Sequence, residues 1–175
     1  MGNTLAIHWT VTTHGTWLHG DPRGSWRNGK LIGPDPLLHQ TASQAMNGDQ
    51  ESLSAHEIDL AAEAFGTVCR NHGHRVLAAT IRSTHAHLVF APLSEPIEKV
   101  TGWIKRQSSA AIFGWRRQHG RSTPQHLWTA RRFLKYIFDE QHLINTIEYV
   151  RRHNLEAGLP ADPFPWIESL STHDI

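Results

Sequence analysis

The sequence predicts an α+β fold, in which an antiparallel sheet carries helices packed on its faces. Four short segments have the alternating or continuous apolar residues that are typical of strands, and longer segments with helical apolar spacing separate them. In chain order the predicted elements are strand, helix, strand, strand, helix, strand, helix. Two of the strands follow each other so closely that they favour an antiparallel hairpin, which distinguishes this order from a purely parallel α/β fold.

The first predicted strand covers residues 5–13, where apolar residues alternate with polar ones. A helix is expected to begin after Ser54, because Ser54 and Glu57 have the spacing of a capping box, in which each side chain satisfies an amide of the first turn. Gly73 is a suitable end for this helix.

The hairpin is predicted over residues 76–83 and 85–92. A second helix follows, and Ser94 is the residue expected to cap it. Residues 133–138 are predicted to form the fourth strand. Asp139 is then expected to cap the third helix.

The length of 175 residues favours one domain with a single core, over residues 1–175. Residues 14–49 are rich in Gly, Pro and Asp and are predicted to form a long loop or insertion, which is either mobile or part of a binding surface. The Pro-rich C-terminal tail, residues 159–175, is expected to pack Trp166 against the body of the domain.

Composition excludes several classes of protein. A net charge of only +1 does not suit a protein that coats DNA non-specifically, so a role on nucleic acid would depend on local basic clusters. The single cysteine, Cys69, excludes an internal disulfide framework. No apolar stretch is long enough for a membrane span, and no signal peptide is apparent, so a cytoplasmic location is expected.

The first segment with chemical content is the His85-Ala-His87 strand. Side chains two residues apart on a strand lie on one side, about 7 Å apart along the chain, so two imidazoles can converge on one ion. Ala86, Leu88 and Phe90 occupy the other side and anchor the strand in the core. Taken alone, such a pair is more often two outward-facing polar residues on an edge strand.

The second segment lies on the third helix, whose apolar stripe contains Leu143, Ile147 and Val150. Tyr149 lies roughly 200° around the helix axis from Ile147, so it is not part of the apolar stripe that packs in the core. His153 is one turn further on the same side. Taken alone, this segment also has an ordinary interpretation, as a partly exposed aromatic residue with an incidental neighbour.

Together, the two segments resemble the HUH superfamily of single-strand DNA endonucleases, in which two histidines flanking a hydrophobic residue precede a helix with a nucleophilic tyrosine. The order and spacing are similar to the single-tyrosine transposases of the insertion-sequence type, and most similar to the branch associated with repetitive extragenic palindromes (REP). The resemblance covers residues 12–24 (TTHGTWLHGDPRG), the HAH strand and residues 149–159 (YVRRHNLEAGL). It implies a ferredoxin-like sandwich. The hydrophobic residue between the two histidines is only Ala86 here, which is a mild departure from the motif of the family.

The resemblance implies that Tyr149 is the catalytic nucleophile and that His85 and His87 hold a divalent metal ion, Mg²⁺ or Mn²⁺. The residue four beyond the tyrosine, usually Asn or Gln in the family, completes the metal site. That position is His153 here, which favours a softer ion than magnesium. Asn154 is an alternative ligand, but we expect His153 to point at the site.

The implied activity is that of a metal-dependent single-strand DNA endonuclease and strand transferase, which acts on hairpin-containing single-stranded DNA through a covalent 5′-phosphotyrosine. We expect DNA-binding contacts from basic residues of the second helix to phosphates and stacking of unpaired bases on tryptophans. The predicted DNA-binding residues are Lys105, Arg106, Arg116, Arg117, Trp17 and Trp26. Packing of both tryptophans within the loop is an equally open interpretation.

Three other functions remain open. The chain can be a catalytically idle DNA-binding regulator derived from such an enzyme, although intact His85, His87 and Tyr149 argue against this. It can be a metal-dependent hydrolase that uses bound water and does not need the tyrosine. It can also be a rolling-circle initiator or a relaxase, but relaxases carry the tyrosine before the histidine pair. The sequence leaves open whether it is a monomer or a homo-oligomer that exchanges the tyrosine helix.

Overall fold

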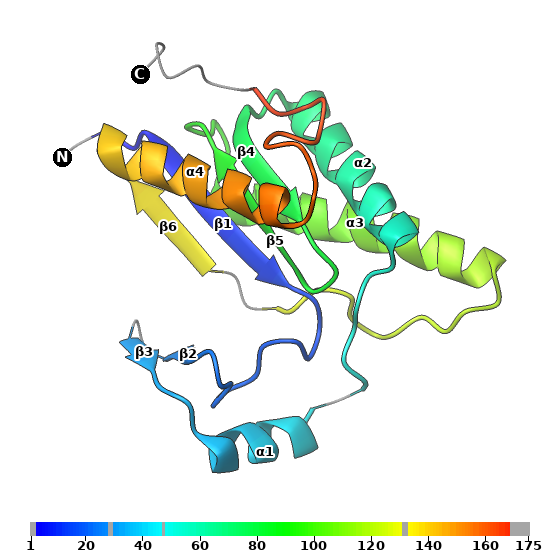
Figure 1. Cartoon of the computed structure of the whole chain (residues 1–175). Coiled ribbons are helices and arrows are strands. Elements are labelled where there is room, and N and C mark those ends of the chain that lie inside the picture. Colours follow the sequence, from blue (N-terminus) through cyan, green and yellow to red (C-terminus); the bar gives the residue numbers. More distant parts are fainter. Residues whose placement is uncertain (1–2, 28–29, 47, 131–132, 169–175) are drawn as a thin grey trace.

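The computed structural model describes residues 3–27, 30–46, 48–130 and 133–168. Its centre is a four-stranded antiparallel sheet with the strand order β4-β5-β1-β6 (Figure 1). The strands are β1 (Ala6–Thr12), β4 (Val76–Ile81), β5 (His85–Phe90) and β6 (Phe133–Ile137). The predicted α+β class, with its β4-β5 hairpin, is confirmed.

Helices cover both faces of this sheet (Figure 1). On one face lie α2 (Ala55–His72) and α3 (Ile97–Gln118), which pack against each other, and on the other lies α4 (Glu140–Glu156). The buried side of α4 contains Leu143, Ile147 and Val150, as the sequence predicted. None of the helices in the described ranges is long and apolar enough to cross a membrane.

Alternation along the strands assigns each side chain to one of the two faces. Trp9 of β1, with none of its surface exposed, packs on the α2–α3 side against Phe65 and Phe90. Ala6 of the same strand lies on the α4 side, in the second apolar cluster with Ile147. The sheet therefore has a large core on one face and a smaller one on the other.

The register of the strands gathers polar residues on the α4 side. His87 of β5 pairs with Thr10 of β1, and His85 pairs with Thr12. His8 lies two residues before Thr10 on the same side. These residues occupy the part of the α4 face that the apolar cluster leaves free.

The helix ends agree with the sequence at three points and differ at one. Ser54 and Glu57 form the capping box, Gly73 ends α2 in the left-handed conformation with φ of 66°, and Asp139 caps α4. The prediction for Ser94 is wrong. Its hydroxyl donates to the carboxylate of neighbouring Glu95, and Pro96 occupies the cap position of α3, which has no side-chain cap.

Residues 14–49 contain regular elements that the sequence analysis did not assign. A two-stranded sheet of β2 (Ser25–Arg27) and β3 (Lys30–Ile32) precedes α1 (Pro36–Gln44). These elements lie beyond the end of β1, away from the main sheet (Figure 1). The strands have three residues each, and α1 has no buried residue, so neither leaves the apolar pattern by which elements are found in a sequence.

The C-terminal segment packs against α2, as expected for Trp166. The Trp166 indole covers Gly66 so closely that a Cβ atom at this glycine would collide with it. Phe164 stacks on the same indole, with ring centroids 5.2 Å apart. A parallel bridge between Val76 and Ile167 joins the segment to β4.

We expect Gly66→Ala to destabilise the protein by about 1–3 kcal/mol, the usual cost of overpacking, because the added methyl must displace the Trp166 indole. Urea unfolding followed by circular dichroism measures the change. Gly114→Ala is the matched control, since its Cβ would meet nothing within 4 Å in α3 and alanine should gain up to about 1 kcal/mol there. Equal shifts in both variants would contradict the packing role of Gly66.

Candidate active site

The histidine pair of β5 faces α4. His85 and His87 lie two residues apart on the strand, and their ring centroids are 5.2 Å apart. The intervening Ala86 is fully buried in the core on the α2–α3 side. His87 is only 7% exposed, whereas His85 is partly exposed near the end of the strand. The strand thus presents both imidazoles on one side while its other side fixes it in the core.

Helix α4 brings Tyr149 and His153 to the same place. Its apolar side is buried, and Tyr149 projects away from it with 42% of its surface exposed. The rings of Tyr149 and His153 have centroids 4.7 Å apart. The centroid of His87 is 5.6 Å from that of Tyr149 and 5.2 Å from that of His153.

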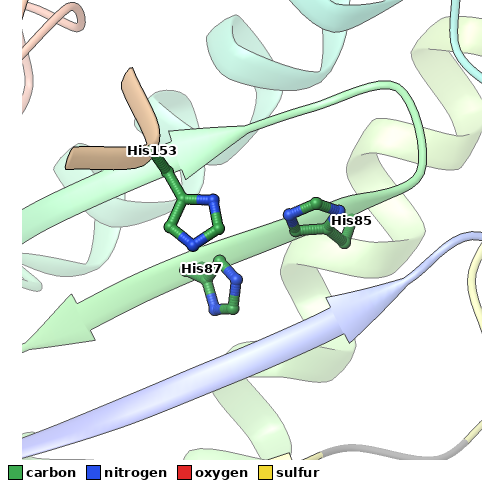
Figure 2. Close-up of side chains that lie close together, drawn as sticks. All are labelled: His85, His87 and His153. Atoms are coloured by element: carbon green, nitrogen blue, oxygen red, sulfur yellow. The ribbon is translucent and has the colours of Figure 1, made fainter. Parts of the chain in front are cut away.

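Three imidazoles form a set of metal-binding atoms. One ring nitrogen from each of His85, His87 and His153 lies within 4.8 Å of the other two, and Figure 2 shows the three rings turned toward one another from β5 and α4. Burial lowers the pKa of His87 to about 2 and that of His85 to about 4. It also lowers the pKa of His153. The rings are neutral at neutral pH, so their lone pairs are available, and the set fits a divalent cation.

Two residues of β1 complete the surroundings of His87, and the sequence analysis missed both as site residues. The Nδ1 atom of His87 lies 2.9 Å from Thr10 Oγ1 and 3.2 Å from His8 Nε2. Burial is also the main cause that lowers the pKa of His8 to about 4, so this ring is neutral. Because Nδ1 is engaged by these partners, Nε2 is the atom of His87 that is left for a metal.

The alternation of β1 contains one indication that His8 and Thr10 could belong to the site. In β1, His8 and Thr10 stand on the polar side of the alternation, whereas Trp9 stands on the core side. From sequence alone, the polar side of a strand is expected to face solvent, because the elements that pack beside it are not known. Only the antiparallel register of β1 and β5 places Thr10 beside His87.

Asn154, the alternative ligand, faces away from the imidazoles. It is fully buried, and its Nδ2 donates to the carbonyls of Ala79 at 2.9 Å and Ala161 at 2.8 Å. It therefore ties α4 to β4 and to the C-terminal segment. A bidentate pair between Arg151 and Asp162 strengthens the same junction. As expected from the helical spacing, His153 rather than Asn154 faces His85 and His87.

The structure corrects the prediction that Arg116 binds DNA. Arg116 is 7% exposed, and its guanidinium donates to the carboxylates of Glu57 and Glu51 at 2.6 and 2.8 Å. These contacts join α3 to α2 and to the segment that precedes it. A buried guanidinium with two carboxylate partners is committed to the fold and is not available to a phosphate.

The other basic residues predicted to bind DNA belong to α3, on the face of the sheet opposite the imidazoles (Figure 1). Arg106 and Arg117 are exposed. Lys105 is partly buried, and its Nζ donates to the Thr129 carbonyl at 2.7 Å. All three therefore belong to a helix on the face of the sheet opposite Tyr149.

The two predicted stacking residues lie in the segment between β1 and α1. Trp17 is 40% exposed, donates through Nε1 to the Gly24 carbonyl at 2.8 Å and has the Arg23 guanidinium 4.9 Å from its ring centre. One side of its ring thus packs within the loop. Trp26 belongs to β2, and its side chain lies outside the part of the structure that is described.

Comparison with solved structures finds the same fold in transposases. A REP-associated tyrosine transposase bound to a REP hairpin matches with a TM-score of 0.55 and 12% identity, over 90% of this chain and 72% of that chain. A candidate transposase from Deinococcus radiodurans R1 matches with a TM-score of 0.48 and 13% identity, over 87% of this chain and 92% of that chain. At such identity the first likeness establishes the fold alone. No curated protein matches the sequence.

The sandwich fold thus carries an HUH-like histidine cluster, with the histidine pair on a central strand and the tyrosine on a facing helix. The sequence model of the family described as "Transposase IS200 like" matches residues 50–153, more than half of the chain, including all three histidines and Tyr149. The chain belongs to the IS200-like transposase family, as its motifs suggested. Membership implies a DNA nuclease or strand-transfer activity.

We expect Thr10→Val to weaken Mn²⁺ binding about 10- to 100-fold, the usual effect of removing a partner of a metal-ligating histidine. The substitution leaves the three ligands in place but removes the shorter contact to His87 Nδ1. Isothermal titration calorimetry with MnCl₂ measures the affinity. Thr12→Val is the matched control, because its hydroxyl, on the same side of β1, contacts Thr129 Oγ1 instead. Equal Mn²⁺ affinity in both variants would remove the positioning role of Thr10.

Proposed function

We propose that this chain nicks and rejoins single-stranded DNA next to hairpins, as a metal-dependent transposase in which Tyr149 is the nucleophile. One observation carries the proposal: a phenol with 42% of its surface exposed stands beside a cluster of three neutral imidazoles. A nucleophile and a cation site next to each other are what the cleavage of a phosphodiester requires. In this proposal the whole chain is one catalytic domain.

The proposed cleavage is a transesterification. The Tyr149 oxygen attacks the phosphorus and forms a 5′-phosphotyrosine, while the bond from phosphorus to the 3′ oxygen breaks. The 3′ oxygen leaves as a hydroxyl after it takes up a proton. The bond energy is kept in the adduct, so a 3′-hydroxyl can later attack it and rejoin the strands without another energy source.

The residues of the chain prepare this reaction in different ways. Burial, followed by the nearby Glu156, raises the pKa of the Tyr149 phenol, so the free side chain stays protonated at neutral pH. Its proton must leave during the attack, and the exposure of the ring allows water to accept it. His85, His87 and His153 are assigned to hold the divalent cation, which when bound supplies positive charge to the phosphate oxygens.

The substrate in this proposal is a hairpin with a single-stranded flank. Membership in the IS200-like family and the similarity of the fold to a transposase that is bound to a REP hairpin support it. The flank would enter the site beside Tyr149. The hairpin would lie further away, where Arg106 and Arg117 of α3, Lys105 and the tryptophans Trp17 and Trp26 are the proposed contacts.

Two alternative functions lead to different observations. A hydrolase that activates water would need the imidazoles but not the phenol, and no covalent adduct would form. An idle DNA-binding regulator would need neither. The position of Tyr149 against His87 and His153 favours the covalent reaction, because both alternatives leave this arrangement without a function.

Replacing the nucleophile tests the proposal directly. Tyr149→Phe should abolish the covalent protein–DNA adduct and leave the affinity for DNA unchanged, because only the attacking oxygen is lost. The adduct is detected by denaturing electrophoresis after incubation with labelled hairpin DNA and Mn²⁺. Tyr136→Phe is the matched control, since Tyr136 is 43% exposed but lies on β6 outside the site, and it should form the adduct normally. Nicking by Tyr149→Phe would favour the water-activating hydrolase.

The third imidazole gives the site a preference among metal ions. Neutral imidazole binds manganese, cobalt or zinc better than magnesium, so Mn²⁺ should support cleavage at a lower concentration than Mg²⁺. His153→Gln replaces the nitrogen ligand by an amide oxygen. The variant should retain cleavage, and the concentrations of Mn²⁺ and Mg²⁺ that support cleavage should become more similar. The measurement is the rate of cleavage as each ion is titrated. An unchanged ion preference in His153→Gln and unchanged metal affinity in His153→Ala would exclude His153 as a ligand.

A further inference from the structure

The site lies between two cations, Arg82 and Lys135, whose charge no carboxylate among the described residues neutralises. Arg82 follows the last residue of β4, and its backbone amide donates to the His85 carbonyl at 2.8 Å. Its guanidinium reaches across to α4, where Nη1 lies 3.5 Å from the His153 carbonyl. After burial, the charge of Arg82 contributes to the lowered pKa of both His85 and His153, as expected for a cation beside them.

The second cation lies on the other side of the cluster. Lys135 of β6 pairs with His8 of β1 in the antiparallel register, so the two side chains share the α4 side of the sheet. Lys135 is exposed. After burial, its charge is the largest contribution to the lowered pKa of His8. The order across this face is therefore Arg82, the imidazoles and Lys135.

Neither cation has a carboxylate partner in the described part of the chain, whereas several other basic residues do. Arg23, Arg70 and Arg151 form ion pairs with Asp21, Glu63 and Asp162. Among the described residues, no carboxylate lies within ion-pair distance of Arg82 or Lys135. Two unneutralised cations beside a site for a divalent cation repel one another, and this arrangement becomes favourable when a polyanion lies across it.

We propose that Arg82 and Lys135 bind backbone phosphates of the substrate strand on the two sides of the phosphate that Tyr149 attacks, an inference that rests on the function proposed above. β4 and β6 are the outer strands of the sheet and are separated by three strand spacings of about 4.8 Å. The two cations therefore contact different phosphates. The single strand crosses the α4 side of the sheet from the β4 edge to the β6 edge and passes Tyr149 on the way.

The binding of DNA can be measured apart from its cleavage. The protein is the Tyr149→Phe variant in EDTA, and the probe is a fluorescein-labelled oligonucleotide without secondary structure, followed by fluorescence anisotropy over a range of NaCl concentrations. Each phosphate contact to a single strand contributes about 0.7 to the slope of log K against log salt. Arg82→Gln and Lys135→Gln should each reduce the slope by about 0.7, and the double variant by about twice as much. Arg82→Lys should restore the slope, because it keeps the charge.

Arg70→Gln is the matched control, because Arg70 is paired with Glu63 on α2, on the opposite face of the sheet, and its slope should not change. Circular dichroism of each variant verifies that it is folded. Slopes and affinities equal to those of the parent in both Gln variants would overturn the inference. A wild-type chain that binds the strand but forms no adduct with Mn²⁺ would instead overturn the proposed function and leave the two phosphate contacts in place.

Discussion

The docking of α4 on the sheet is the interaction on which the candidate site depends. The site is divided between two elements, because β5 supplies two imidazoles and α4 supplies Tyr149 and the third imidazole. Apolar residues of α4 pack on β4 and β5, and Asn154 hydrogen-bonds the Ala79 carbonyl from a fully buried position. A shift of α4 by one residue would turn Tyr149 and His153 about 100° away from the strand. The packing of this helix therefore sets the geometry of the site.

The two faces of the sheet differ in how much apolar core they carry. The face that carries α2 and α3 holds the larger core, around Trp9, and the buried contacts of Arg116 with Glu57 and Glu51 join its helices. The other face has a smaller core that leaves room for polar side chains beside α4. Most of the apolar core lies on one side of the sheet, so the other side has room for the imidazoles beside α4. Strand alternation makes this division possible.

The electrostatics of the polar face match the proposed reaction. The imidazoles are kept neutral by burial, which makes their nitrogens available to a cation, and Thr10 and His8 engage the Nδ1 of His87. Arg82 and Lys135 add positive charge at the margins without carboxylate partners among the described residues. A face of this kind attracts a phosphate backbone, although the net charge of the whole chain is only +1. In this proposal the local placement of charge, rather than the total charge of the chain, provides the affinity for a polyanion.

The sequence by itself determined the main elements and the candidate site residues on β5 and α4, because apolar periodicity and side-chain alternation are local properties of the chain. It placed His85 and His87 on one side of a strand and kept Tyr149 and His153 off the apolar stripe of their helix. It did not reveal β2 and β3, which have three residues each, or α1, which has no buried residue. Only the tertiary structure decided that Arg116 is buried and that α3 lies opposite the site. Only the strand register set His8 and Thr10 beside His87, because contacts between residues far apart in the chain depend on how the strands pair and not on the spacing within any one of them.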